Sequence, residues 1–144
     1  MPQNDNHQPR RYNSLRAPWA DYSDPGVFFL TICTHDRVPL FGKIVNGKFI
    51  SNQFGSIVWE VWNNLSRRYP QISIDTAIVM PDHFHGIVII HDNIRELSIE
   101  NPYNGLDAQS RRKMTIPLVV GYFKTMSAKK INRLRSSPGV PVWQ

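Results

Sequence analysis

Hydrophobic residues recur along the chain with two different periods, which predict where strands and helices lie. The run Val27–Thr34 is β-branched and aromatic, with apolar side chains at odd and even positions, so it predicts a strand buried on both faces in the middle of a sheet. Within Lys43–Ile50, Asn46-Gly47 separates two short apolar runs, a pattern typical of a tight β-hairpin. The strand-like runs Ile72–Met80 and His83–His91 are separated by a two-residue turn, so we expect them to be antiparallel neighbours.

Two other segments have the helical period. Between residues 54 and 68 one apolar stripe follows the spacing of a helix face, and it consists of Phe54, Ile57, Val58, Val61, Trp62 and Leu65. A second helix is predicted over about 116–134, with Pro117 in its first turn. Residues 92–113 are predicted to form a long loop and residues 1–25 a polar N-terminal arm, which leaves 26–144 as the domain. This order of elements predicts an α+β fold, a ferredoxin-like antiparallel sheet with two helices on one face.

Composition excludes several classes of protein. A length of 144 residues suits one domain, and no apolar run reaches the roughly 18 residues of a membrane-spanning helix. The N-terminal residues lack the hydrophobic core of a signal peptide, and the single Cys33 cannot form an intramolecular disulfide, so we expect a cytoplasmic protein. A zinc site built from cysteines is excluded for the same reason.

Charge is distributed unevenly along the chain. All 11 acidic residues lie at or before Asp107, where nine basic residues leave a net charge of −2. The segment after Asp107 has no acid and a net charge of +8, carried by Arg111, Arg112, Lys113, Lys124, Lys129, Lys130, Arg133 and Arg135. Such a segment is often only a solvated surface, but without acids four residues away to pair with these cations, contact with nucleic-acid phosphates is the more economical explanation.

His83-Phe84-His85 is the strongest candidate for chemistry. Residues i and i+2 of a strand point to the same face, so both imidazoles can reach one divalent cation while Phe84 points into the core. Two histidines on a strand are most often ordinary surface residues, and two imidazoles do not complete a coordination sphere. Third ligands could come from Asp82, Asp36 or His35, and the sequence does not choose among them.

Several segments together resemble one family. Met80–Val88 (MPDHFHGIV) is similar to the histidine-bearing strand of the small single-tyrosine HUH transposases. Residues 11–16, 21–26 and 29–37 are similar to the N-terminal stretch of their REP-associated tyrosine transposase branch. Val120–Asn132 (VGYFKTMSAKKIN) is similar to its Phe-Lys helix, and Pro141–Gln144 (PVWQ) to the segment before its nucleophile. These similarities occur in the family's order from about residue 11 to the last residue.

The resemblance implies a DNA-binding protein of DNA transposition and recombination that acts on single-stranded or hairpin DNA. It also implies that His83 and His85 hold Mg²⁺ or Mn²⁺, and that Lys124 lies near the scissile phosphate. The family's nucleophilic tyrosine would follow Gln144, where this sequence stops, and the five tyrosines present do not match its position. We therefore expect DNA binding without cleavage.

Two alternatives belong to other classes. One is a non-catalytic module that grips DNA or RNA hairpins, and a second, less favoured, is a metal-dependent hydrolase that uses His83 and His85 without a tyrosine. The hydrolase lacks a matching general base and does not account for the basic C-terminal segment. A second copy of the chain is a further candidate partner.

Overall fold

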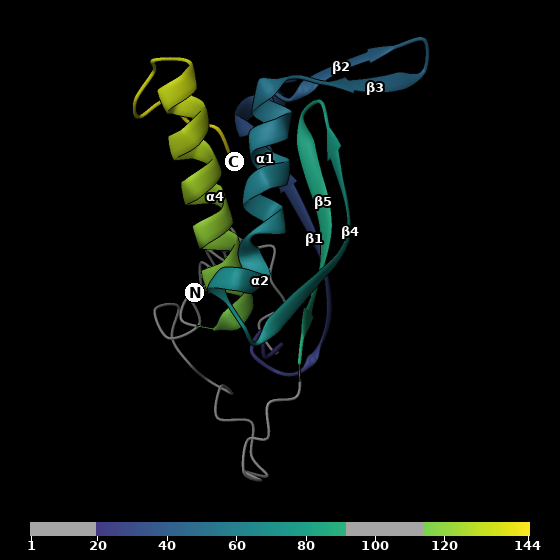
Figure 1. Ribbon diagram of the computed structural model, residues 1–144, viewed down its shortest axis with the longest axis vertical. Coiled ribbons are helices and arrows are strands. Elements are labelled where there is room, and N and C mark those ends of the chain that lie inside the picture. The colour runs from purple at the N-terminus through teal and green to yellow at the C-terminus, as the bar shows by residue number, and fades with distance from the viewer. Residues whose placement is uncertain (1–19, 92–113) are drawn as a thin grey trace, which may run out of the picture.

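The computed structural model describes residues 20–91 and 114–144 (Figure 1). Its strands are β1 (Gly26–Cys33), β2 (Gly42–Val45), β3 (Lys48–Ser51), β4 (Ile72–Met80) and β5 (His83–Ile90). Its helices are α1 (Gln53–Asn63), α2 (Leu65–Arg68) and α4 (Thr115–Leu134), with the short 3₁₀ helix η1 (His35–Arg37) after β1. None of the helices in these described ranges has the length and apolar content needed to cross a bilayer.

The main sheet has the strand order β1-β5-β4, and both pairings are antiparallel. β2 and β3 form a separate hairpin that projects from the body, while α1 and α4 lie against the same face of the main sheet (Figure 1). The turn of the hairpin has positive φ at Asn46 and Gly47, as the Asn-Gly signal predicts. The predicted α+β architecture of ferredoxin-like kind, with an antiparallel sheet and two helices on one face, is confirmed.

The position of β1 differs from the prediction. β5 is the middle strand of the described sheet, and β1 lies beside it with Val27 70% and Phe29 67% exposed. The expectation of burial on both faces was wrong because both helices pack on one face, which leaves the opposite side of β1 uncovered. Apolar residues at both odd and even positions identify a strand, but they do not determine which layers cover it.

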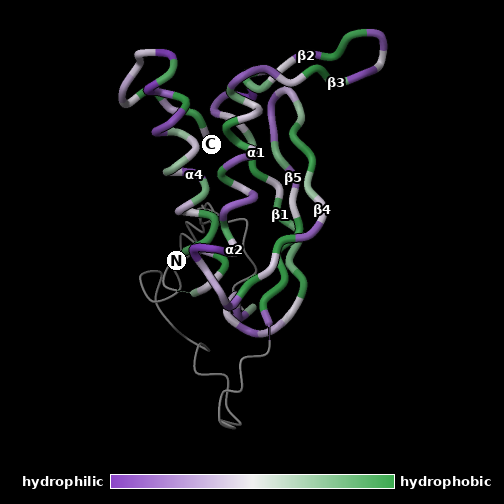
Figure 2. The backbone as a smooth tube through the Cα atoms, in the orientation of Figure 1, coloured by the Kyte–Doolittle hydropathy of each residue, from purple (hydrophilic) through white to green (hydrophobic). Residues whose placement is uncertain are grey.

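The hydrophobic core lies between the sheet and the two helices. Phe84 of β5 is fully buried, with its ring centroid 4.8 Å from that of Trp62 on α1 and 4.9 Å from that of Phe123 on α4. Trp143, near the end of the chain, extends this aromatic cluster at 5.5 Å from Phe123. Figure 2 shows hydrophobic residues along the strands and mainly hydrophilic ones toward the end of α4. One side of β5 is therefore anchored in an aromatic core.

Two predicted boundaries shift for local reasons. The helix expected over 54–68 is interrupted at Asn64, whose side-chain amide donates to the Glu60 carbonyl at 2.8 Å while its backbone N–H bonds to the Val61 carbonyl. This competition tightens the turn and separates α1 from α2. The predicted arm ends earlier than residue 25, because the Tyr22 carbonyl and the Ser23 hydroxyl accept the first N–H groups of α4.

Two glycine substitutions test the packing of β5. A Cβ at Gly86 would lie 2.6 Å from Cη2 of Trp62, whereas a Cβ at Gly121 of α4 would meet no atom within 4 Å. We expect Gly86→Ala to lower the free energy of unfolding by about 1–3 kcal/mol, because a methyl group overpacks the core. Gly121→Ala is the matched control and should raise the free energy of unfolding by about 0.5–1 kcal/mol. Urea denaturation measures both, and equal effects of the two changes would contradict this account of the packing.

Candidate functional site

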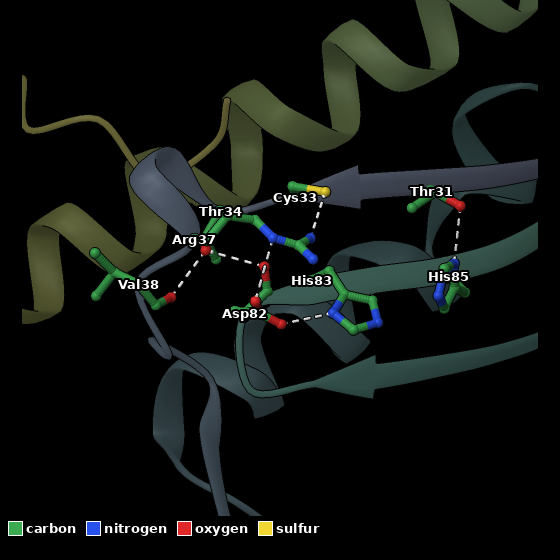
Figure 3. A network of polar contacts seen from close by, with 8 residues as sticks. All are labelled: Thr31, Cys33, Thr34, Arg37, Val38, Asp82, His83 and His85. Atoms are coloured by element: carbon green, nitrogen blue, oxygen red, sulfur yellow. Dashed lines mark hydrogen bonds and ion pairs between the residues drawn. The ribbon is translucent and has the colours of Figure 1, made fainter.

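His83 and His85 of β5 point to the same side of the sheet, away from the helices (Figure 3). Both side chains are half-buried, and their ring centroids are 4.7 Å apart with an interplanar angle of 73°. Phe84 between them is fully buried on the other side. The predicted alternation is therefore confirmed, and the two imidazoles are close enough to act on one ligand.

Each imidazole is oriented by a hydrogen bond to its Nδ1 atom. His83 Nδ1 donates to Oδ1 of Asp82 at 2.6 Å, since a carboxylate can only accept. His85 Nδ1 is hydrogen-bonded to the hydroxyl of Thr31 on β1 at 2.9 Å. These contacts leave the Nε2 atoms as the nitrogens available to a cation, as in protein metal sites whose histidines are held by an outer partner.

Asp82 joins the pair to the end of β1. Its Oδ2 lies 3.3 Å from Nε of Arg37, and Nη1 of Arg37 donates to Sγ of Cys33 at 2.8 Å (Figure 3). The hydrogen bond from His83 lowers the pKa of Asp82, and the positive charge of Arg37 lowers it further. The carboxylate therefore stays ionised and keeps the His83 ring in one orientation.

Backbone contacts fix the turn that precedes His83. The carbonyl of Asp82 accepts hydrogen bonds from the backbone N–H of Thr34 at 2.9 Å and from its hydroxyl at 3.0 Å. The neighbouring Pro81 carbonyl accepts from the N–H of Phe41 at 3.0 Å. Because Thr34 and Phe41 are buried, this end of the sheet is held rigidly.

The predicted third ligands do not complete a metal site. Asp82 is engaged by His83 and Arg37, and Oδ2 of Asp36 lies 3.4 Å from Nε2 of His35. Among the described residues, no three His, Cys, Asp or Glu side chains form a group that could hold a metal ion. A cavity of about 190 Å³ lies elsewhere, beside His35, Arg135 and Val142. The histidine pair thus lies on an open surface and offers two ligands.

The basic residues of α4 and the segment after it fall into two groups. Lys130 pairs with Glu60 of α1 at 2.6 Å, Arg135 bonds to Asn132 and to the carbonyls of residues 140 and 141, and Nζ of Lys124 donates to the Gln144 carbonyl. The expectation that Lys130 has no acidic partner was wrong, because the acid comes from another helix rather than from α4 itself.

Lys129 and Arg133 form the second group. Both are exposed, and within residues 20–91 and 114–144 neither side chain has an ion pair or hydrogen bond. They lie four residues apart on α4, on the opposite side of the sheet from the histidines. Arg111, Arg112 and Lys113 lie outside the described residues. The structure therefore does not bring the basic helix and the histidine pair onto one face.

The tyrosines among the described residues pack against other side chains, away from the histidine pair. The rings of Tyr69 and Tyr122 meet edge to face at 5.8 Å in the helical layer, and Tyr22 packs beside Phe28 at 6.2 Å. Burial raises the pKa of Tyr69, and the neighbouring Tyr122 raises it further, against the opposing effect of Arg68. Tyr12 and Tyr103 lie outside the described residues. Tyr122 is thus separated from the histidines by the sheet.

Four residues near the pair were not identified from the sequence. Thr31 and Cys33 are the cross-strand partners of His85 and His83, Phe29 stacks on His85 at 5.2 Å, and Arg37 reaches Asp82. The signal that could have found the first two is the register between β1 and β5. That register depends on how the strands pair and not on either sequence alone.

A protein of Haemophilus influenzae is similar to part of this chain. The two are 35% identical over 82 residues, which is 57% of this chain and 46% of that protein, whose name is "Uncharacterized protein". No family model matches the chain. The similar segment thus spans less than half the length of this relative.

The role of Asp82 can be tested by pH. Its lowered pKa means that it stabilises the fold fully above the ordinary value of about 3.9, and that this contribution is lost as pH falls through the lower folded-state pKa. We expect Asp82→Asn to destabilise the protein at pH 6 and the difference from wild type to shrink near pH 3. Urea denaturation at both values checks this, with Asp24→Asn, an exposed change, as control. A difference independent of pH would contradict the account.

Proposed function

We propose that this chain is a DNA-binding protein of the single-tyrosine HUH transposase class, which binds single-stranded or hairpin DNA. The observation that carries the proposal is the oriented pair of imidazoles, 4.7 Å apart on one face of the sheet. A second support is that sequence motifs resembling those of this class occur in the same order, from about residue 11 to Gln144.

The two imidazoles would supply part of the coordination of a weakly held divalent cation, with water in the remaining positions. His83 and His85 would hold Mg²⁺ or Mn²⁺ through Nε2, with Asp82 and Thr31 keeping the rings in place. Such a cation, when bound, offsets negative charge on phosphate oxygens. Asp82 also opposes rotation of the His83 ring, so the pair is preorganised before DNA arrives.

Two exposed cations support contact with a phosphate backbone. Lys129 and Arg133 lie one turn apart on α4. Their positive charges have no acidic partner among the described residues, and bringing them to phosphates releases counterions from the DNA. Because the helix lies on the other side of the sheet from the histidines, we propose that it holds a different part of the DNA from the part at the imidazoles.

We propose binding rather than strand cleavage as the activity of these residues. A covalent route would require a tyrosine oxygen aligned with a phosphate beside the cation. Tyr69 and Tyr122 are paired with each other in the helical layer instead. This favours the non-catalytic hairpin-binding module as the second candidate function.

Metal binding is tested by calorimetry. Replacing His83 and His85 together with alanine should abolish the binding of Mn²⁺, because these two side chains supply both of the proposed ligand nitrogens. Thr31→Val should weaken binding by less, about 10- to 100-fold, since it removes only an orienting hydrogen bond. His91→Ala, an exposed histidine beyond the end of β5, is the control and should leave Mn²⁺ binding unchanged. Unchanged binding in the double variant would show that these histidines are not ligands.

DNA binding is tested by fluorescence anisotropy with a labelled hairpin. We expect the logarithm of affinity to fall with the logarithm of salt concentration, with a slope of about −0.7 per single-strand phosphate neutralised. Lys129→Glu with Arg133→Glu should lower affinity for all sequences alike and make this slope shallower. Lys43→Glu with Lys48→Glu, on the β2–β3 hairpin, makes the same change in net charge and should have a smaller effect. Equal effects of the two pairs would assign binding to net charge rather than to α4.

A further inference from the structure

The face of the sheet that carries the histidines is unusually apolar for an exposed surface. Val27 of β1 is 70% exposed, Phe29 of β1 67% and Ile78 of β4 51%. Ile78 and Thr31 are the cross-strand neighbours of His85 on its two sides, so these residues surround the imidazoles. Exposed apolar residues rimmed by polar groups are typical of a binding surface.

Phe29 is the part of this surface with a defined geometry. Its ring is stacked on that of His85, with centroids 5.2 Å apart and an interplanar angle of 22°. His85 in turn meets His83 at 4.7 Å, so the three rings form a row across β1 and β5. At 67% exposure, Phe29 offers most of its ring to solvent at the end of this row.

We propose that Phe29 is a stacking platform for an unpaired nucleobase of DNA that lies against the histidine pair. The inference rests on the proposed function and names what the DNA presents at the site, a single-stranded nucleotide next to the hairpin stem. Every base has a π-face, so an exposed aromatic ring binds bases without strong sequence preference. The imidazoles lie one ring away from Phe29, close enough for a phosphate of the same nucleotide to reach them.

A second copy of the chain fits this surface less well. Nδ1 of each imidazole already has a hydrogen-bond partner, so an apolar protein partner would bury the two Nε2 atoms along with the aliphatic side chains. Burying polar atoms without hydrogen-bond partners is costly. A nucleotide satisfies both kinds of surface, because its base covers Phe29 while its phosphate faces the imidazoles.

The test measures the affinity of the full chain for a blunt DNA hairpin and for the same hairpin with a four-nucleotide unpaired tail at either end. The tail is made with normal nucleotides and with abasic ones. The variants are Phe29→Leu, which keeps an apolar side chain without a π-face, and Phe29→Trp, which keeps the π-face. Val27→Ala is the matched control, an exposed residue of the same strand and face. Mn²⁺ binding in each variant checks that the histidine pair is intact.

We expect the normal tail to raise affinity and the abasic tail not to. Phe29→Leu should reduce the tail-dependent gain by about 5- to 150-fold, the range of one stacked base, with blunt-hairpin affinity and Mn²⁺ binding unchanged. In the Phe29→Leu variant, replacing the normal tail with the abasic tail should not lower the affinity further. Phe29→Trp and Val27→Ala should keep the gain.

Several results would overturn the inference. If the blunt hairpin binds but the tail adds nothing, or if Phe29→Leu keeps the full gain, the proposed function stands and the stacking platform is refuted. If Phe29→Leu and Val27→Ala lose the tail-dependent gain in affinity equally, the gain comes from exposed apolar area and not from stacking. If Phe29→Leu instead turns a dimer into a monomer in sedimentation while the gain persists, the face is a contact between copies. If no DNA binds, the proposed function fails as well.

Discussion

The site depends on the burial of Phe84. This ring lies between Trp62 of α1 and Phe123 of α4 and is shielded completely from solvent, so β5 cannot slip by one residue without exposing it and burying an imidazole. The same alternation turns His83 and His85 outward. The orientation of the candidate metal ligands is thus a consequence of core packing, and the close approach of Trp62 to Gly86 restricts the strand further.

A polar network at one end of the sheet holds the turn before His83, in addition to the packing of the core. Thr34 binds the carbonyl of Asp82, while Arg37 and His83 share its carboxylate. The segment after α4 belongs to this end as well, because Trp143 pairs with Thr34 and its indole N–H donates to Ser127 of α4 at 2.9 Å. Three parts of the chain that are distant in sequence therefore meet at the turn before His83, and together they hold the ring that Asp82 orients.

The two faces of the sheet have different roles. One carries both helices and the aromatic core, and beyond it the exposed cations of α4. The other remains open, with the imidazoles among Phe29, Ile78 and Thr31. A nucleic acid that used both the histidines and α4 would have to pass around the edge of the domain, since these groups lie on opposite sides.

The sequence by itself determined the elements and the alternation within them. The hydrophobic period and the turn residues were enough to predict β4, β5, the Asn-Gly hairpin and α4. The His-Phe-His spacing was enough to place two imidazoles on one face. Both properties depend on neighbours within a few residues. Tertiary structure alone decided that β1 is exposed on one side, that Glu60 pairs with Lys130, and that Thr31, Arg37 and Phe29 surround the histidines. Those contacts join residues from separate elements, and which of them meet depends on strand register and on which face the helices cover, neither of which local patterns encode.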